Sequence, residues 1–203
     1  MITKIFEFKN PNYVYHVGDL KHKTDYIGDK LYHIKNMNFL NNSKTGHFGA
    51  GYYFFGKLDD ALTYQKQAKR NIVMIDFSLY NLYKPEDAED FVESTIALTE
   101  YLSNINEEDL VTVKFDKFIK DLTIDLKHFN INLSEETVKT ITNQYLSDLI
   151  KQDNPKSDYI ITRFLKACNY DGIDFRNTKY DNFYLGSVLY DIKSDIINYK
   201  NNI

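Results

Sequence analysis

The distribution of apolar residues predicts strands near both ends of the chain and helices between them. Segments with the length and composition of β-strands fall at residues 5–8, 13–17 and 71–77. Residues 59–70 combine helix-forming alanine and leucine with acidic residues at the start and basic residues at the end. They therefore predict a helix, and the polar residues 41–46 predict a turn.

Helical spacing dominates the middle of the chain, from residue 84 to residue 168. Four sets of apolar residues recur at intervals of three or four, beginning at Ala88, Phe115, Val138 and Ile160. Pro85 is expected at the first helical position, and Ser134 is expected to cap the third helix. Residues 84–168 are therefore predicted to form a helical subregion inserted between strands.

Strands are expected again after the helices. They are predicted within residues 170–177, 185–192 and 196–199. Early strands, a helical block and late strands indicate an α+β fold in which strands from both ends of the chain pair across the insertion. With 203 residues and 43% apolar content, the chain is expected to form a single domain over residues 1–203.

An aromatic stretch between the early strands is the strongest chemical signal. Residues 46–55 read Gly-His-Phe-Gly-Ala-Gly-Tyr-Tyr-Phe-Phe. Alternation in an extended segment places Tyr53 and Phe55 on one side and Tyr52 and Phe54 on the other. Tyr64, in the following helix, can return to the side of Tyr53, so that two rings sandwich a flat, cationic ligand. The alternative is an aromatic-rich core strand after a tight turn.

Composition and motif spacing exclude several classes of function. The net charge of −4 argues against a high-affinity, nonspecific nucleic-acid binder. The segment Gly49-Ala50-Gly51 has Phe54 where a dinucleotide-binding loop needs a third glycine, and Gly-Lys-Ser/Thr and Gly-x-Ser-x-Gly motifs do not occur. The five histidines lack metal-ligand spacing, so no metal is expected.

Two further features bear on location. No apolar run approaches the roughly 20 residues that a transmembrane helix needs, and residues 1–10 lack the apolar core of a signal peptide. Cys168 is the only cysteine, so no disulfide can form within the chain. A cytoplasmic location without a membrane partner is therefore expected.

Three short motifs resemble those of a known family. Residues 48–55, followed by Ala61 and Tyr64, resemble the F-G-x-G-x-Y-F-A signature of the ADP-ribosyltransferase superfamily, in the branch of poly(ADP-ribose) polymerases and diphtheria-type toxins. Residues 13–18, Tyr-Val-Tyr-His-Val-Gly, resemble that family's first strand, with the glycine one residue later. Residues 183–192 resemble the strand of the third family position, where Gly186 replaces the family's glutamate.

The resemblance implies a fold of two small antiparallel sheets around an NAD cleft, with a helical insertion. His16 would bind the adenosine-ribose hydroxyls, the backbone of Val17 would clasp the nicotinamide carboxamide, and Tyr53 and Tyr64 would enclose the nicotinamide ring. The implied NAD-binding residues are His16, Val17, Gly18, Phe48, Gly49, Gly51, Tyr53, Tyr64, Gly186 and Ser187. His16, Tyr53 and Tyr64 are the implied catalytic side chains.

Two hypotheses follow from the resemblance. The first is a mono-ADP-ribosyltransferase acting on a protein or nucleic acid, as a bacterial or phage toxin, effector or anti-defence protein. The second is a non-catalytic module of the same fold that binds NAD, ADP-ribose or a partner. Asp174 and Asp181 are possible substitutes for the missing glutamate, although ordinary surface or turn carboxylates are an alternative. Residues 84–168 are expected to recognise the target or an antitoxin-like partner, and helices that only cover the core are the alternative.

Overall fold

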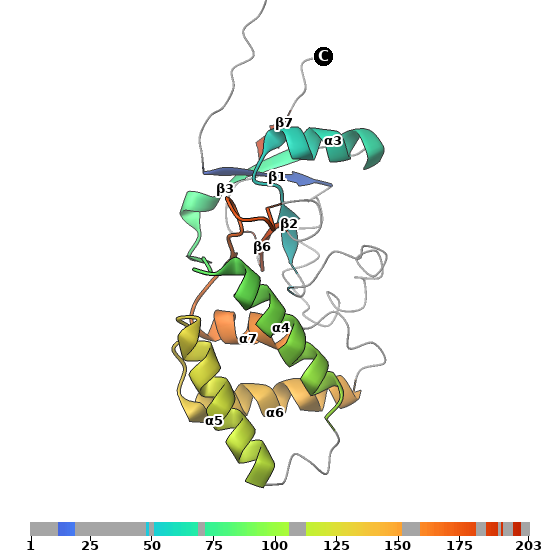
Figure 1. Cartoon of the computed structure of the whole chain (residues 1–203). Coiled ribbons are helices and arrows are strands. Elements are labelled where there is room, and N and C mark those ends of the chain that lie inside the picture. The colour runs from blue at the N-terminus through green and yellow to red at the C-terminus, as the bar shows by residue number, and fades with distance from the viewer. Residues whose placement is uncertain are drawn as a thin grey trace, which may run out of the picture.

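A computed structural model describes residues 12–18, 48, 51–68, 72–105, 113–151, 159–181, 186–190, 192 and 197–199. The predicted strand at 5–8, the predicted turn at 41–46 and the site residue Gly49 lie outside these residues. The described elements form the expected α+β fold. Among the described residues, the two small sheets and helix α3 (Leu58–Ala68) lie toward one end of the molecule, and helices α4 to α7, which fall within residues 88–167, lie toward the other (Figure 1).

The first sheet joins strands from both ends of the chain. It contains β1 (Tyr13–Val17), β3 (Ile72–Asp76) and β7 (Ile197–Tyr199), in the antiparallel order β1-β3-β7. Helix α3 (Leu58–Ala68) covers one face of this sheet (Figure 1). Because side chains alternate along a strand, Ile72 and Met74 pack toward α3, whereas Val73 and Ile75 pack on the opposite face.

The second sheet corrects the expectation that both sheets are antiparallel. It contains β2 (Tyr52–Phe54), β6 (Ser187–Leu189), β5 (Gly172–Ile173) and β4 (Leu82–Tyr83), in the order β2-β6-β5-β4. The β4–β5 pair is parallel. A parallel pair needs a long crossover connection, and the helical insertion between β4 and β5 supplies it. The sheet is therefore mixed.

Four described helices lie within the predicted helical subregion. They are α4 (Ala88–Ser103), α5 (Val113–His128), α6 (Glu135–Lys151) and α7 (Ile160–Ala167). Pro85 is not the first helical position, because the Asp87 carboxylate caps α4 by accepting hydrogen bonds from the amides of Glu89 and Asp90. Ser134 caps α6 as expected, since its hydroxyl accepts a hydrogen bond from the Thr137 amide.

Three apolar clusters hold these elements together. The helical core cluster joins α4–α7 with the second sheet and includes Phe48, Phe91, Leu122, Tyr145, Phe164, Phe175 and Val188. The inter-sheet cluster consists of Val14, Phe54, Val73, Ile75, Phe77, Tyr80, Leu189 and Ile192. The α3 cluster consists of Tyr15, Val17, Ala61, Ile72 and Met74. The first sheet thus has one face against α3 and the other against the second sheet.

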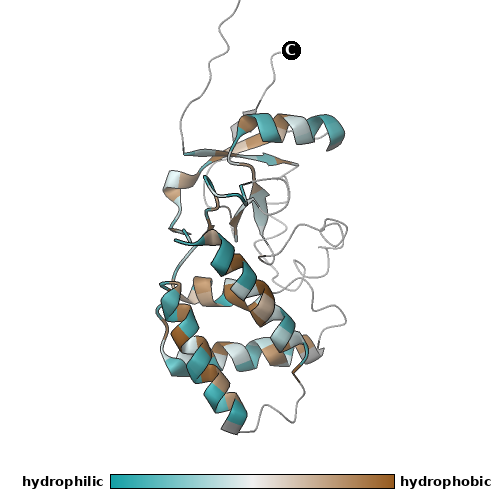
Figure 2. Ribbon diagram, viewed as in Figure 1, coloured by the Kyte–Doolittle hydropathy of each residue, from teal (hydrophilic) through white to brown (hydrophobic). Residues whose placement is uncertain are grey.

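The helices of the subregion are amphipathic. Hydrophobic and hydrophilic residues form separate stripes along α4 and α5 (Figure 2). Among the residues that the structure describes, no helix has both the length and the apolar character needed to cross a membrane.

Candidate functional site

His16 lies on the side of β1 that faces the second sheet. Its ring packs near Phe54 and Tyr52, with centroid distances of 5.7 Å and 6.4 Å. Its Nδ1 is 2.9 Å from the carbonyl oxygen of Tyr53. A carbonyl can only accept a hydrogen bond, so Nδ1 carries a hydrogen, and in the neutral form of the ring Nε2 would be the acceptor nitrogen. This tautomer suits an interaction with a ribose hydroxyl.

Gly18 makes room for the His16 ring. A Cβ atom at Gly18 would lie 2.6 Å from His16 Nε2, well inside contact distance. Gly18, which comes one residue later than the glycine of the family motif, therefore leaves space for the His16 ring. Val17 lies opposite Ile72 in the β1–β3 ladder, with its side chain in the α3 cluster. A contact between its backbone and a carboxamide stays a prediction.

Tyr53 points away from His16 and into the helical end of the molecule. Its half-buried ring packs against the helical core cluster, and its hydroxyl accepts a hydrogen bond of 3.2 Å from the Phe48 amide. Burial of the hydroxyl raises the pKa of Tyr53 well above its usual range. The Phe48 carbonyl in turn accepts a hydrogen bond of 2.9 Å from the Thr162 hydroxyl of α7. Tyr53 and Thr162 therefore both hydrogen-bond to the backbone of Phe48, the first residue of the aromatic motif.

Tyr64 lies in a different cluster from Tyr53. Its ring is 5.7 Å from that of Phe55, and both rings pack against the α3 cluster. The sandwich of Tyr53 and Tyr64 expected from their spacing is therefore not formed by these two described residues. Tyr52 and Phe54 face His16 instead, because alternation along β2 turns Tyr53 to the opposite side.

Gly51 serves the contact between β2 and β6. A Cβ atom at Gly51 would lie 2.5 Å from Val188 Cγ2 and 2.8 Å from the Leu189 carbonyl oxygen. Since backbone atoms cannot give way cheaply, glycine is required for this close approach. The proposed role of Gly51 in admitting a ligand ring is thus accompanied by a packing role that the sequence did not indicate.

The third motif position lies beside the aromatic strand. Gly186 has a φ of 54°, in the left-handed region, and its amide donates a hydrogen bond to the Tyr180 carbonyl. Ser187 pairs with Phe54 in the β2–β6 register. Its buried hydroxyl accepts a hydrogen bond of 2.9 Å from the Phe175 amide and lies 3.4 Å from Asp174 Oδ1. This hydroxyl is therefore committed to interior contacts.

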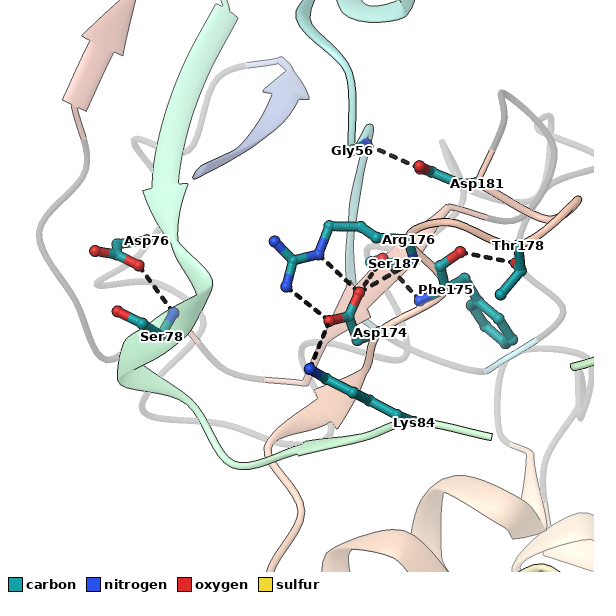
Figure 3. Close-up of polar contacts among 10 residues, drawn as sticks. All are labelled: Gly56, Asp76, Ser78, Lys84, Asp174, Phe175, Arg176, Thr178, Asp181 and Ser187. Carbon is teal, nitrogen blue, oxygen red and sulfur yellow. Dashed lines mark hydrogen bonds and ion pairs between the residues drawn. The ribbon is translucent and has the colours of Figure 1, made fainter. Parts of the chain in front are cut away.

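Asp174 is buried, so the alternative that it is an ordinary surface carboxylate is wrong. Its side chain is 4% exposed and receives two hydrogen bonds from Arg176, of 2.8 Å and 2.7 Å (Figure 3). Lys84 Nζ is 3.6 Å away. Burial alone raises the pKa of Asp174, but the hydrogen bonds and charge of Arg176, with the charge of Lys84, hold this pKa below its usual value. Asp174 is thus an ion-paired structural carboxylate next to Ser187.

Asp181 is half-buried and lies in a turn, which agrees with the alternative prediction of a turn carboxylate. Its Oδ1 accepts a hydrogen bond of 3.0 Å from the Gly56 amide, just after the aromatic stretch (Figure 3). Burial raises the pKa of Asp181 above its usual value, although backbone hydrogen bonds from Gly56 and Asn177 and the charge of Lys57 oppose this change. Of the two carboxylates proposed to replace the family's glutamate, Asp181 is the one whose environment favours the protonated form.

The three motif segments meet on neighbouring strands. Tyr15 of β1 and Phe55 exchange backbone hydrogen bonds of 2.9 Å and 2.7 Å. On its other side, β2 pairs with β6, which carries Ser187. The order of backbone contacts is therefore β1, the aromatic strand, and the strand of the third motif.

Sequence reasoning missed several residues of this region. Arg176 follows Asp174 by two positions, and this spacing in an extended segment is a usable signal for a shared side. Thr162, by contrast, lies within a helix far along the chain from Phe48, and nothing in the sequence indicates their contact. Among the described residues, no group of three or more His, Cys, Asp or Glu side chains is placed to hold a metal ion.

No protein-family model matches the chain, and no curated protein or solved structure shows significant similarity to it.

Proposed function

We propose that the chain is a mono-ADP-ribosyltransferase that uses NAD to modify a protein or nucleic acid, as a bacterial or phage toxin, effector or anti-defence protein. The observation that supports this proposal is the meeting of three motif segments on neighbouring strands. The contact of His16 Nδ1 with the Tyr53 carbonyl joins the first segment to the second, and the pairing of Phe54 with Ser187 joins the second to the third. An aromatic strand in the core alone would not require a histidine at this junction.

The proposed reaction requires few catalytic side chains. Nicotinamide is a good leaving group, and its departure leaves an oxocarbenium-like ribose that an acceptor group of the target attacks, as in glycoside cleavage. The protein mainly has to hold both ends of NAD in position. His16 Nε2, as the acceptor nitrogen, would bind a hydroxyl of the adenosine ribose.

We propose Tyr52 as a second candidate stacking residue beside the family-implied Tyr53. Tyr52 is half-buried and meets the His16 ring edge-on, at an interplanar angle of 81°. Tyr53→Phe separates the roles of Tyr53, because it keeps the ring and removes the hydroxyl that holds Phe48. If Tyr53 stacks on nicotinamide, Tyr53→Phe retains NAD affinity, and Tyr53→Ala loses about 1 to 3 kcal/mol of binding free energy. If Tyr52 stacks, Tyr52→Ala carries that loss instead. Isothermal titration of NAD into folded variants distinguishes the two.

Gly186 leads us to expect single ADP-ribose units on the target. Chain growth requires a hydroxyl of bound ADP-ribose to be activated, and a carboxylate is the group suited to that proton transfer. Gly186 has no side chain, and the Ser187 hydroxyl is a weak base that already bonds inside the protein. Mass analysis of a modified target should show one unit per site. Linked units would contradict this expectation and would point to Asp181.

The activity is tested with labelled NAD and cell lysate. Label that enters macromolecules and is released by protease, or instead by nuclease, supports the enzyme and identifies the class of target. The matched control is His16→Gln, which keeps a polar side chain and removes the imidazole. Transfer that is equal in the wild type and in a folded His16→Gln variant would refute the assigned site, and no transfer to any lysate fraction would refute the enzyme.

The alternative function is a non-catalytic module of the same fold that binds NAD, ADP-ribose or a partner. A specific observation favours it, since the Ser187 hydroxyl and the Asp174 carboxylate are both engaged inside the protein. Binding of NAD without turnover in the same assay supports this alternative.

A further inference from the structure

A pocket between α4 and α5 lies outside the proposed NAD site. It has a volume of about 460 Å³. Its lining residues from α4 are Asp90, Phe91, Ser94, Thr95, Ala97, Leu98 and Tyr101. The opposite wall comes from α5 and the residue after it, and Ile161 of α7 adds to the lining. In Figure 1, α7 passes behind α4.

The interior of this pocket is apolar. Phe91, Leu122, Leu126 and Ile161, which are nearly completely buried, form its floor. Contacts between the two helices bound it at both ends. The rings of Tyr101 and Phe118 are 4.8 Å apart at one end, and His128 Nε2 is 3.5 Å from Asp90 Oδ2 at the other. From Asp90 to Tyr101 the α4 wall runs for about 16 Å, or three helical turns, at 1.5 Å per residue.

The rim of the pocket is acidic. The described lining residues include three exposed carboxylates, Asp90, Asp121 and Asp125, and one histidine, His128. The lysines of α5 do not line the pocket, and α4 contains no lysine or arginine. An anionic ligand such as NAD is therefore disfavoured here, whereas a ligand with both apolar and cationic groups matches the floor and the rim.

We propose that this pocket docks a basic amphipathic helix of a partner protein. Apolar side chains at positions i, i+4 and i+7 of such a helix lie on one face, span about 10 Å and can insert between α4 and α5. Lysine or arginine residues beside them meet Asp121 and Asp125. The exposed ring of Tyr101, with 51% of its surface accessible, extends the apolar contact at the end of the pocket. This interaction is separate from the proposed transferase activity and does not depend on it.

The test uses a defined probe because no partner is identified. A labelled synthetic helix of about four turns carries leucines at i, i+4 and i+7 flanked by lysines, and a matched peptide carries glutamates in place of the lysines. Fluorescence anisotropy measures the binding of both to the full chain. We expect the lysine peptide to bind at least about tenfold more tightly than the glutamate peptide.

Three variants locate the binding. Asp121→Lys combined with Asp125→Lys should weaken binding of the lysine peptide by about tenfold or more. Glu93→Lys combined with Glu100→Lys changes the net charge equally at exposed positions of α4 that do not line the pocket, and should change binding by less than about threefold. Ala97→Trp places a large ring at the mouth of the pocket and should abolish binding. Circular dichroism confirms that each variant is folded.

Other outcomes would overturn the proposal. Equal binding of the lysine peptide to all variants would show nonspecific attraction to an acidic surface. Equal binding of both peptides would show that charge does not select the ligand, and failure of both to bind would show that no helix docks. A dimer of the wild type in size-exclusion chromatography that Ala97→Trp dissociates would identify a second copy of this chain as the occupant.

Discussion

Removal of Arg176 should destabilise the protein more than removal of the carboxylate with which it pairs. Arg176→Met keeps an aliphatic stem but withdraws the two side-chain hydrogen bonds that reach Asp174, whose side chain is 4% exposed. Lys84 at 3.6 Å and the Ser187 hydroxyl at 3.4 Å remain as weaker compensation. An uncompensated buried charge costs about 3 to 5 kcal/mol in the free energy of unfolding.

Asp174→Asn is expected to cost less, about 1 to 3 kcal/mol. The asparagine oxygen can still accept a hydrogen bond from the Arg176 backbone amide. The Arg176 side chain is 15% exposed, and its guanidinium carbon lies 5.2 Å from the centre of the Phe77 ring. The Asp174→Asn/Arg176→Met double variant no longer buries a lone carboxylate. We therefore expect the double variant to lose less free energy of unfolding than the sum of the two single variants, by about 2 kcal/mol or more.

Urea unfolding followed by circular dichroism at neutral pH measures all three variants. The pH dependence gives an independent check. The folded pKa of Asp174 is lower than its unfolded pKa, so its contribution is present above the unfolded value and is lost as the pH falls through the folded value. Asp174→Asn should remove this part of the acid sensitivity. A loss below about 1 kcal/mol for Arg176→Met, or additive losses in the double variant, would refute the assignment of a buried, coupled ion pair.

Three further predictions concern the strands around the candidate site. Gly51→Ala should lower the stability by about 1 to 3 kcal/mol in urea unfolding, because its Cβ would collide with the Leu189 carbonyl, and an unchanged midpoint would show that β2 can shift freely. Gly186→Ala should cost about 1 to 2 kcal/mol because alanine is strained at a φ of 54°, and thermal unfolding tests this. For Asp181 the folded pKa is raised above the unfolded one, so stability falls as the pH rises through the folded value. Asp181→Asn should therefore raise the melting temperature at neutral pH and lose this advantage in acid, whereas a lower melting temperature at neutral pH would contradict the raised pKa.

The helices and the pairing across the insertion were predictable from the sequence because they depend on local period and on the order of elements. Ser134 with two glutamates after it marked the start of α6, and the continuous apolar run at 72–75 marked β3. β4 was missed because Leu82 and Tyr83 form a strand too short to show a period.

The arrangement of side chains at the candidate site was less accessible to sequence reasoning. Alternation correctly placed Tyr52 and Phe54 on the same side of β2, but the prediction that Tyr53 and Phe55 share the other side is wrong, because Tyr53 packs against the helical core cluster and Phe55 against the α3 cluster. Alternation also could not tell which residues face His16. That choice depends on how β2 docks between the first sheet and the helices, which is a tertiary property. The burial of Asp174 likewise depends on Arg176 and on the distant Lys84 and Ser187, and a single carboxylate in a sequence carries no sign of it.

The position of β6 in the second sheet has a consequence for synthesis of the protein. β6 lies between β2 and β5, so β2 has no neighbour on that side until α4–α7 and β5 have been translated. During that interval the aromatic edge of β2 is open to pairing with other chains, as unpaired strands generally are. The nascent chain should therefore depend on chaperones more than its isolated helices would, and slower translation through the helices should lengthen its exposure to aggregation.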